Sequence, residues 1–237
     1  MFDYKATSFA LIIAGLLGAA ISILLGFIWV PSLDPETTLG EEAFRIIYWH
    51  VSFAWCSFIS FLMLFAGSLL WYLKNDEIGW RYFSTGSDMG LLFGFGVITS
   101  GPIWGLAAWG KPWDWGDLRL NSFALLTAVA LFLVLARKSQ QDNDENRDTL
   151  SIIGLFGFSL VPITAVATTY YNRRHPPIVI IKGDETGLPN EILFVLIFTF
   201  ISFCFLFAGL SLLTDRINQL ESKIEGHQRN IDSRWPN

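Results

Sequence analysis

Six long apolar runs alternate with short polar segments along the 237-residue chain. A helix rises about 1.5 Å per residue, so about 20 apolar residues cross a hydrocarbon core about 30 Å thick. Each run is long enough for one crossing. The pattern therefore predicts an all-α integral membrane bundle of six transmembrane helices, with spans at about 7–30, 46–73, 89–108, 120–137, 150–171 and 191–214.

The composition agrees with a membrane protein. Hydrophobic residues make up 52% of the chain, charged residues make up 16%, and the mean hydropathy is +0.45. These values are too apolar for an ordinary soluble domain. The first run is expected to be a retained helix rather than a cleaved signal, because Lys5 is the only basic residue before it and no small-x-small cleavage site follows it.

Neither an internal repeat nor a low-complexity linker divides the sequence. The strongly polar segment at 138–148 is expected to be a short inner loop. We therefore predict a single membrane domain over residues 1–237, with a short cytoplasmic tail at 215–237. This tail is expected to continue the sixth helix as an amphipathic stalk, because apolar residues recur at helical spacing at Leu213, Ile217, Leu220 and Ile224.

The distribution of lysine and arginine predicts the orientation of the helices. Six crossings place both termini on one side, which receives ten basic residues: Lys5, Lys74, Arg81, Arg137, Lys138, Arg147, Arg216, Lys223, Arg229 and Arg234. The other side receives six: Arg45, Lys111, Arg119, Arg173, Arg174 and Lys182. We therefore expect cytoplasmic termini in the cell membrane. The net charge of −5 forms no basic stripe, which argues against nucleic acid as a partner.

Two of the three histidines fall at the predicted outer surface. His50 opens the second predicted helix. His175 follows the fifth, and Pro176 disfavours the helical conformation at His175, which places this histidine at or just beyond the helix end. His227 lies in the charged tail and is expected to be inert. The cysteines, Cys56 and Cys204, fall inside apolar runs and are expected to be packing residues.

Tryptophans crowd the second outer loop, WGKPWDWGDLRL at 109–120. Membrane interfaces are ordinarily rich in tryptophan, so a belt role is open for any single one of them. Here, however, four lie in one glycine- and proline-rich segment that is expected to bend and present indole faces: Trp104, Trp109, Trp113 and Trp115. Such faces suit a large planar aromatic ligand, and two histidines could bind its iron from opposite sides.

Haem is such a ligand, and its propionates would need cations on the outer side. Arg119, Arg173 and Arg174 are the candidates for these charge-assisted bonds. Asp114 and Asp117 would repel propionates. These two aspartates are instead expected to cap the fourth helix, accept an indole N–H or pair with Arg119.

Four segments together resemble the WWD-domain haem-handling family that includes CcmC and CcsA, and are most similar to CcmC. They are FRIIYWHVSFAW at 44–55, TSGPIWG at 99–105, WGKPWDWGDLRLNS at 109–122, and VPIT with YYNRRHPP within 161–177. The resemblance covers roughly residues 40–215.

The resemblance implies that His50 and His175 are the axial haem ligands and that the tryptophan segment is an outer shelf for haem. Asp117 matches the aspartate of the family motif, but Gly116 intervenes after Trp115, so Asp114 is an alternative match. The arginine pair Arg173 and Arg174 also departs from the family pattern, and it could hold the propionates.

The function implied is transient binding of haem b on the outer face and its delivery to a haem chaperone of the CcmE type during cytochrome c maturation. Further implied partners are ABC transporter subunits of the CcmA and CcmB type and a small membrane protein of the CcmD type. Haem would be handed over rather than used in catalysis. Ligation by two histidines leaves no open iron position, which argues against oxygen chemistry.

Two alternatives remain open. A subunit of a cytochrome c haem lyase would resemble the larger members of the superfamily, but these carry additional histidines for a transmembrane haem, and the chain has three in all. A transporter with an aromatic outer vestibule would need ionisable residues near the bilayer midplane, and none lies well inside the predicted spans.

Overall fold

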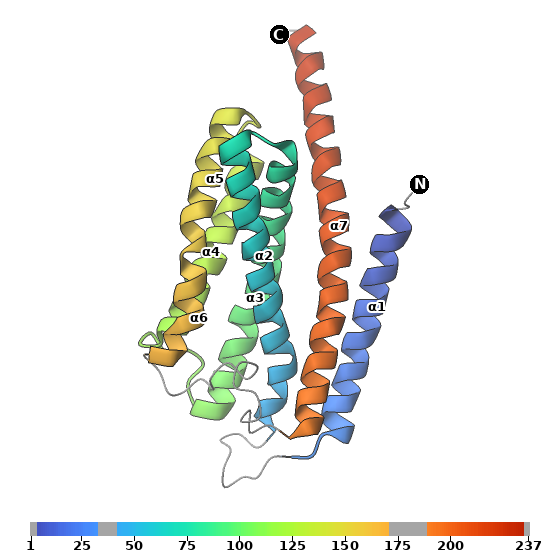
Figure 1. Ribbon diagram of the computed structural model, residues 1–237, viewed down its shortest axis with the longest axis vertical. Coiled ribbons are helices and arrows are strands. Elements are labelled where there is room, and N and C mark those ends of the chain that lie inside the picture. Colours follow the sequence, from blue (N-terminus) through green and yellow to red (C-terminus); the bar gives the residue numbers. More distant parts are fainter. Residues whose placement is uncertain (1–3, 33–41, 171–188, 235–237) are drawn as a thin grey trace.

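The computed structural model describes residues 4–32, 42–170 and 189–234, and in these residues the regular structure is entirely helical. The elements are α1 (Tyr4–Leu24), the π-helical turn η1 (Leu25–Trp29), the 3₁₀ turn η2 (Ala43–Ile46), α2 (Ile47–Lys74), α3 (Glu77–Trp109), α4 (Leu118–Ser139), α5 (Asp144–Phe158), α6 (Leu160–Tyr170) and α7 (Asn190–Arg234). The helices run side by side along the long axis, and both ends of the chain lie at the upper end in Figure 1.

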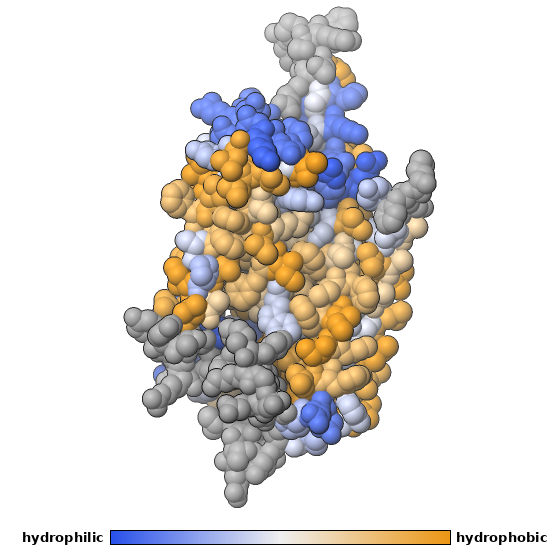
Figure 2. Space-filling view, in the orientation of Figure 1, coloured by the Kyte–Doolittle hydropathy of each residue, from blue (hydrophilic) through white to orange (hydrophobic). Residues whose placement is uncertain are grey.

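Six segments of the described chain are long and apolar enough to cross a membrane, which confirms the predicted six-span helical bundle. They are Tyr4–Trp29, Ala43–Lys74, Glu77–Trp109, Leu118–Ser139, Asp144–Val166 and Asn190–Gln228. Apolar side chains cover the middle of the molecule, and hydrophilic residues gather at its upper end (Figure 2). The protein is therefore a multi-pass membrane protein.

The helices α2 and α3 make the most extensive contact in the bundle, and they pack closely. A Cβ atom added to Gly67 would lie 2.2 Å from the backbone nitrogen of Phe83, and one added to Gly86 would lie 2.5 Å from that of Leu64. Only glycine allows the two backbones to approach this closely, as is common where membrane helices pack. The short connection between the helices contains Asn75 in the left-handed conformation, at φ 49°.

The third span begins at Glu77 rather than at 89, so the predicted start was wrong by three helical turns. The sequence from 77 to 88 looked like a loop because it is rich in charged and small residues. It is helical because Asp76 accepts a hydrogen bond from the Ile78 N–H as an N-cap, and small residues pack against α2. Arg81 consequently lies on a helix, where it pairs with Asp215 of α7 at 2.6 Å.

The fifth span also differs from the prediction of 150–171. It begins earlier, at Asp144, where Asn143 caps α5. It is interrupted at Ser159, between α5 and α6. Pro162 explains the interruption, because proline has no N–H to donate to the Phe158 carbonyl four residues earlier. At the break, the hydroxyl and the backbone N–H of Ser159 both donate to the Phe156 carbonyl.

The helix α7 continues through most of the predicted tail and ends at Arg234. The expected helical continuation of the sixth span is thus confirmed, and its apolar stripe includes the exposed residues Ile217, Leu220 and Ile224. Lower down, α1 packs closely along α7: a Cβ added to Gly15 would lie 2.7 Å from the Leu206 backbone nitrogen. The first and last spans therefore form a pair beside the α2–α6 bundle (Figure 1).

Candidate functional site

His50 lies in the first turn of α2, at the end of the bundle opposite the two chain termini (Figure 1). Its Nδ1 lies 2.9 Å from the hydroxyl of Ser100 on α3. The adjacent Gly101 also faces the imidazole, since a Cβ built there would lie 3.4 Å from His50 Cε1, at van der Waals distance. The close contact of α2 with α3 thus places the first predicted iron ligand against the last three turns of α3.

Trp104 continues this site along α3. Its ring centroid lies 6.3 Å from that of His50, and 5.0 Å from that of Trp109, the last residue of the helix. Gly110 ends α3 with a φ of 68°, a conformation that suits glycine. Two of the four predicted tryptophans therefore lie beside the predicted histidine, with the rings tilted by 45° and 52° at the two contacts.

The other two tryptophans lie in the connection between α3 and α4. The ring centroids of Trp113 and Trp115 are 5.8 Å apart. A turn orders this connection: the Asp114 carboxylate accepts the Gly116 N–H at 2.9 Å, and the Asp114 carbonyl accepts the Asp117 N–H at 3.0 Å. Trp115 is 84% exposed, so its ring is available to a ligand or a partner protein.

Asp117 is the N-cap of α4. Its carboxylate accepts the backbone N–H groups of Arg119 and Leu120 at 2.9 and 3.2 Å, and the residue is 1% exposed. Capping of the fourth helix, one of the roles expected for the aspartates, is thereby confirmed for Asp117. Asp114 stabilises the preceding turn instead. The Arg119 side chain begins in the first turn of α4 and is half-buried.

Asn121 is a residue of the site that sequence reasoning missed. Its amide donates to the carbonyls of Trp115 and Asp117 at 2.7 and 2.9 Å, and its side-chain oxygen accepts the Trp113 indole N–H at 3.3 Å. Asn121 therefore fixes the tryptophan connection onto α4. The available signal was its position one helical turn after the N-cap Asp117, where an amide can reach back to the preceding loop.

Arg45 was also missed, because it had been counted only as a loop cation. It is 7% exposed and donates to the carbonyl of Gly26, inside the π-helical turn at the end of α1, and to that of Val30, directly after the turn. It also pairs with Glu42. Hydrogen bonds from Arg45 and Ser32 lower the pKa of Glu42. This buried cation ties the end of the first span to the start of the helix that carries His50.

A mostly apolar cavity of about 270 Å³ lies next to Arg45, between α1, the start of α2 and the end of α3. Its lining includes Phe27, Trp49, Ile103 and Trp104. Trp104 therefore lines this cavity and also lies beside His50.

Three predicted site residues, Arg173, Arg174 and His175, lie outside the described part of the chain. The preceding helix α6 ends at Tyr170, at the same end of the bundle as His50 and Trp109 (Figure 1). The structure thus brings together His50, the tryptophans and Asp117 near that end.

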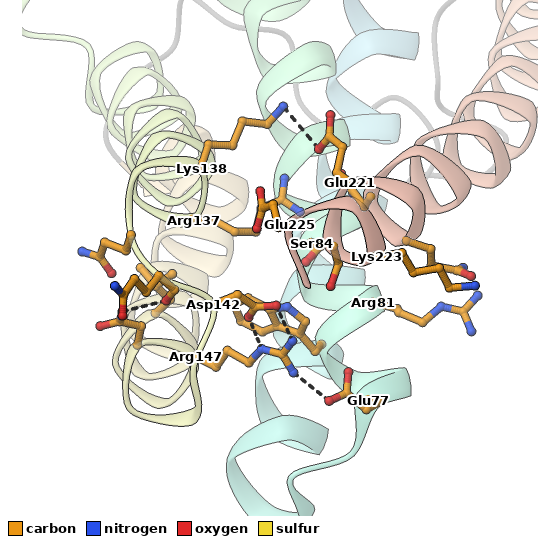
Figure 3. Close-up of a pocket in the computed structure, with 18 residues that line it drawn as sticks. Glu77, Arg81, Ser84, Arg137, Lys138, Asp142, Arg147, Glu221, Lys223 and Glu225 are labelled. Carbon is orange, nitrogen blue, oxygen red and sulfur yellow. Dashed lines mark hydrogen bonds and ion pairs between the residues drawn. The ribbon is translucent and has the colours of Figure 1, made fainter. Parts of the chain in front are cut away.

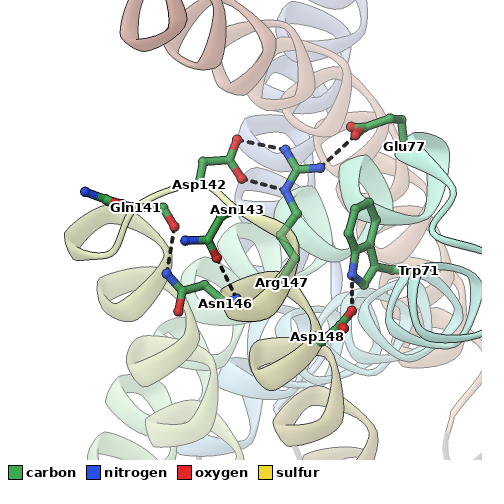
Figure 4. A network of polar contacts seen from close by, with 8 residues as sticks. All are labelled: Trp71, Glu77, Gln141, Asp142, Asn143, Asn146, Arg147 and Asp148. Atoms are coloured by element: carbon green, nitrogen blue, oxygen red, sulfur yellow. Dashed lines mark hydrogen bonds and ion pairs between the residues drawn. The ribbon is translucent and has the colours of Figure 1, made fainter. Parts of the chain in front are cut away.

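A second cavity, of about 260 Å³, lies at the opposite end of the bundle, between the start of α3, the α4–α5 connection and α7 (Figure 3). Charged side chains line it in pairs. Arg147 bonds both oxygens of Asp142, at 2.5 and 2.7 Å, and also Glu77, at 2.7 Å (Figure 4). The same guanidinium lies over the ring of Trp71 at 4.8 Å. These contacts join helices and are separate from the tryptophan segment.

The fold and the site define a class of protein: a multi-pass helical membrane protein with an imidazole and a cluster of indoles at one end of its bundle. The comparisons identify the family. The chain belongs to the CcmC family, described as heme exporter protein C, whose family model matches residues 3–230.

Known relatives agree with this assignment. Heme exporter protein C of Bradyrhizobium diazoefficiens is 26% identical over 216 residues, covering 90% of this chain and 81% of its own length. A putative cytochrome c biosynthesis ccmC-like mitochondrial protein of Arabidopsis thaliana is 30% identical over 227 residues, covering 93% and 83%. Its counterpart in Marchantia polymorpha is 28% identical over 193 residues, covering 78% and 81%.

Proposed function

We propose that this protein handles haem during cytochrome c maturation, by holding haem b transiently at the end of the bundle that carries His50 and the tryptophan segment. The observation that carries the proposal is the placement of the His50 imidazole, hydrogen-bonded through Nδ1 to Ser100 and adjacent to Trp104. Imidazole is a usual axial ligand of haem iron, and indole rings suit the porphyrin plane. The names of the relatives, heme exporter and cytochrome c biosynthesis proteins, support the same function.

In this proposal His175 supplies the second axial ligand. It lies five positions beyond the end of α6 at Tyr170, and α6 ends at the level of the tryptophan segment. Arg173 and Arg174 precede it directly and would hold the propionates together with Arg119. Haem would supply the iron, and the two histidines would supply its imidazole ligands. The protein residues would bind the haem, orient it and limit its contact with water.

The site would face the outer side of the membrane, with both termini in the cytoplasm. The excess of basic residues on the side of the termini supports this orientation. Trp115, at 84% exposure, would then be accessible to a haem chaperone of the CcmE type. ABC transporter subunits of the CcmA and CcmB type and a small CcmD-type protein are further proposed partners.

Holding and transferring haem, rather than catalysis, is the activity that these residues support best. An attachment enzyme would need further haem ligands at membrane depth, and the third histidine, His227, is an exposed residue on the cytoplasmic extension proposed for α7. Haem lyase activity is therefore the second candidate.

Haem titration of the purified protein in detergent tests the proposal. The unaltered protein should bind haem with a six-coordinate absorption spectrum, and His50→Ala and His175→Ala should each lower its occupancy. His227→Ala is the matched control and should bind haem like the unaltered protein. An unchanged spectrum and occupancy in both His50→Ala and His175→Ala would remove the proposed ligands.

A further inference from the structure

We propose that Ser100 is a positioning residue for His50: its hydroxyl accepts the His50 Nδ1–H and thereby makes Nε2 the nitrogen presented to iron. This inference rests on the proposed function, because it concerns how the proposed ligand is prepared for haem. It assigns a role to a residue fifty positions away from His50 in the sequence.

The direction of the hydrogen bond follows from the other partners of Ser100. A serine hydroxyl has one proton to donate. Ser100 Oγ lies 2.6 Å from the Gly96 carbonyl oxygen, which can only accept. If the proton pointed to His50 instead, two oxygens would face each other at this distance without a proton between them. The proton therefore lies toward Gly96, and Ser100 Oγ accepts from His50 Nδ1 at 2.9 Å.

The tautomer of His50 follows from this direction. A neutral imidazole that carries its proton on Nδ1 has its lone pair on Nε2. Metal-ligating histidines generally donate their other ring N–H to an acceptor, which fixes both the tautomer and the orientation of the ring. The chain of bonds from His50 through Ser100 to Gly96 provides such an acceptor, anchored on the backbone of α3.

Two further residues of α3 lie beside the same ring. A Cβ built at Gly101 would lie 3.4 Å from Cε1, and the Trp104 ring centroid, one turn further along α3, lies 6.3 Å from that of His50. The neighbouring Thr99 is different: its hydroxyl donates to the Phe95 carbonyl at 2.8 Å, and its side chain is exposed. Thr99→Ala is thus a matched control, since this substitution also removes a hydroxyl from the same helical turn.

Nitrogen NMR on the protein without haem tests the tautomer directly. With ¹⁵N-labelled histidine each of the three imidazoles gives a pair of ring-nitrogen signals, and His50→Ala identifies the pair that belongs to His50. At a pH where the imidazoles are neutral, the unaltered protein should show His50 protonated on Nδ1. Ser100→Ala should move the proton at least partly to Nε2, whereas Thr99→Ala should not. A His50 protonated on Nε2 in the unaltered protein overturns the inference without any variant.

Haem titration supplies the second measurement. Loss of such a partner typically weakens metal binding 10- to 100-fold, so Ser100→Ala should weaken haem binding by about tenfold or more. Ser100→Thr keeps a hydroxyl that can donate to the carbonyl four residues earlier, and it should restore both affinity and tautomer. If Ser100→Ala changes neither the haem affinity nor the tautomer of His50, while His50→Ala does lose haem, the inference about Ser100 is overturned and the proposed function is not. If His50→Ala keeps haem, it is the proposed ligation that fails.

Discussion

Arg137 of α4 and Asp88 of α3 form an ion pair, with 2.6 Å between Arg137 Nη2 and Asp88 Oδ1. Their side chains are 11% and 17% exposed. The second oxygen of Asp88 accepts from the Asn218 amide of α7 at 2.9 Å, so one carboxylate joins three helices. This contact lies toward the end of the bundle that carries the termini, far from the proposed haem site.

We predict that Asp88→Ala lowers the stability of the protein by about 3 kcal/mol, because removal of one partner leaves a buried charge uncompensated. Thermal unfolding in detergent measures the effect. The double variant Asp88→Ala with Arg137→Met should recover part of the loss, since it removes the remaining charge. Haem affinity should stay unchanged in the folded fraction. Equal stability of the single variant and the unaltered protein would contradict the role of this pair.

Asp117 could stabilise the protein through its N-cap hydrogen bonds or through its negative charge, and two variants distinguish these roles. We expect Asp117→Ala to destabilise the protein by about 1 kcal/mol, the usual cost of losing an N-cap. Asp117→Asn keeps an acceptor oxygen at the cap, and it should retain most of the stability. Thermal unfolding of the two variants decides the matter. If Asp117→Asn loses as much as Asp117→Ala, the charge of Asp117 matters rather than its cap.

The tryptophan connection should matter to haem more than an ordinary interfacial tryptophan. Aromatic contacts contribute about 0.5–1.5 kcal/mol beyond burial, so Trp113→Ala should weaken haem binding about 2- to 10-fold. Trp29 is the control, because it ends the first span and makes a T-shaped contact with Phe194, with 5.6 Å between the ring centroids. Haem titration of the two variants provides the comparison. Equal losses would favour a belt role for both tryptophans.

Glu42 should make the stability of the protein depend measurably on pH. Its pKa is lowered by hydrogen bonds from Arg45 and Ser32. A carboxylate with a lowered pKa stabilises the fold above its ordinary pKa, and this contribution disappears as the pH falls through the lowered value. Glu42→Gln should therefore reduce the loss of stability below about pH 4.3, the ordinary value for glutamate. Unfolding temperatures measured over that range, with Glu145→Gln as an exposed control, check the difference.

The arrangement of the spans was predictable because crossing a membrane demands long apolar helices, and the chain shows them plainly. Boundaries were harder to predict. The first three turns of α3, from Glu77, contain small and charged residues that pack against α2 or pair with α7, and hydropathy does not register such contacts. The break at Ser159 had a local signal in Pro162, but the surrounding residues are apolar enough for a continuous helix.

At the candidate site, the types of residue that suit haem could be read from the sequence, whereas their supports could not. His50 and the tryptophans are conspicuous because the chain has only three histidines and because four indoles crowd one short segment. Ser100 and Arg45 look ordinary, and their roles depend on partners that lie on other elements. Such pairings follow from how α1, α2 and α3 pack, which the pattern of one helix does not encode.

The glycine contacts between α2 and α3 have a consequence for mutational studies of this protein. Gly67 and Gly86 allow the close spacing of α2 and α3. The His50–Ser100 hydrogen bond joins the same two helices nearer their other end. An alanine at position 86 would push α3 away from α2. The resulting change in the angle between the helices would displace Ser100 relative to the His50 imidazole. Under the proposed function, a substitution at Gly86 should therefore impair haem handling from a position far from the proposed haem site.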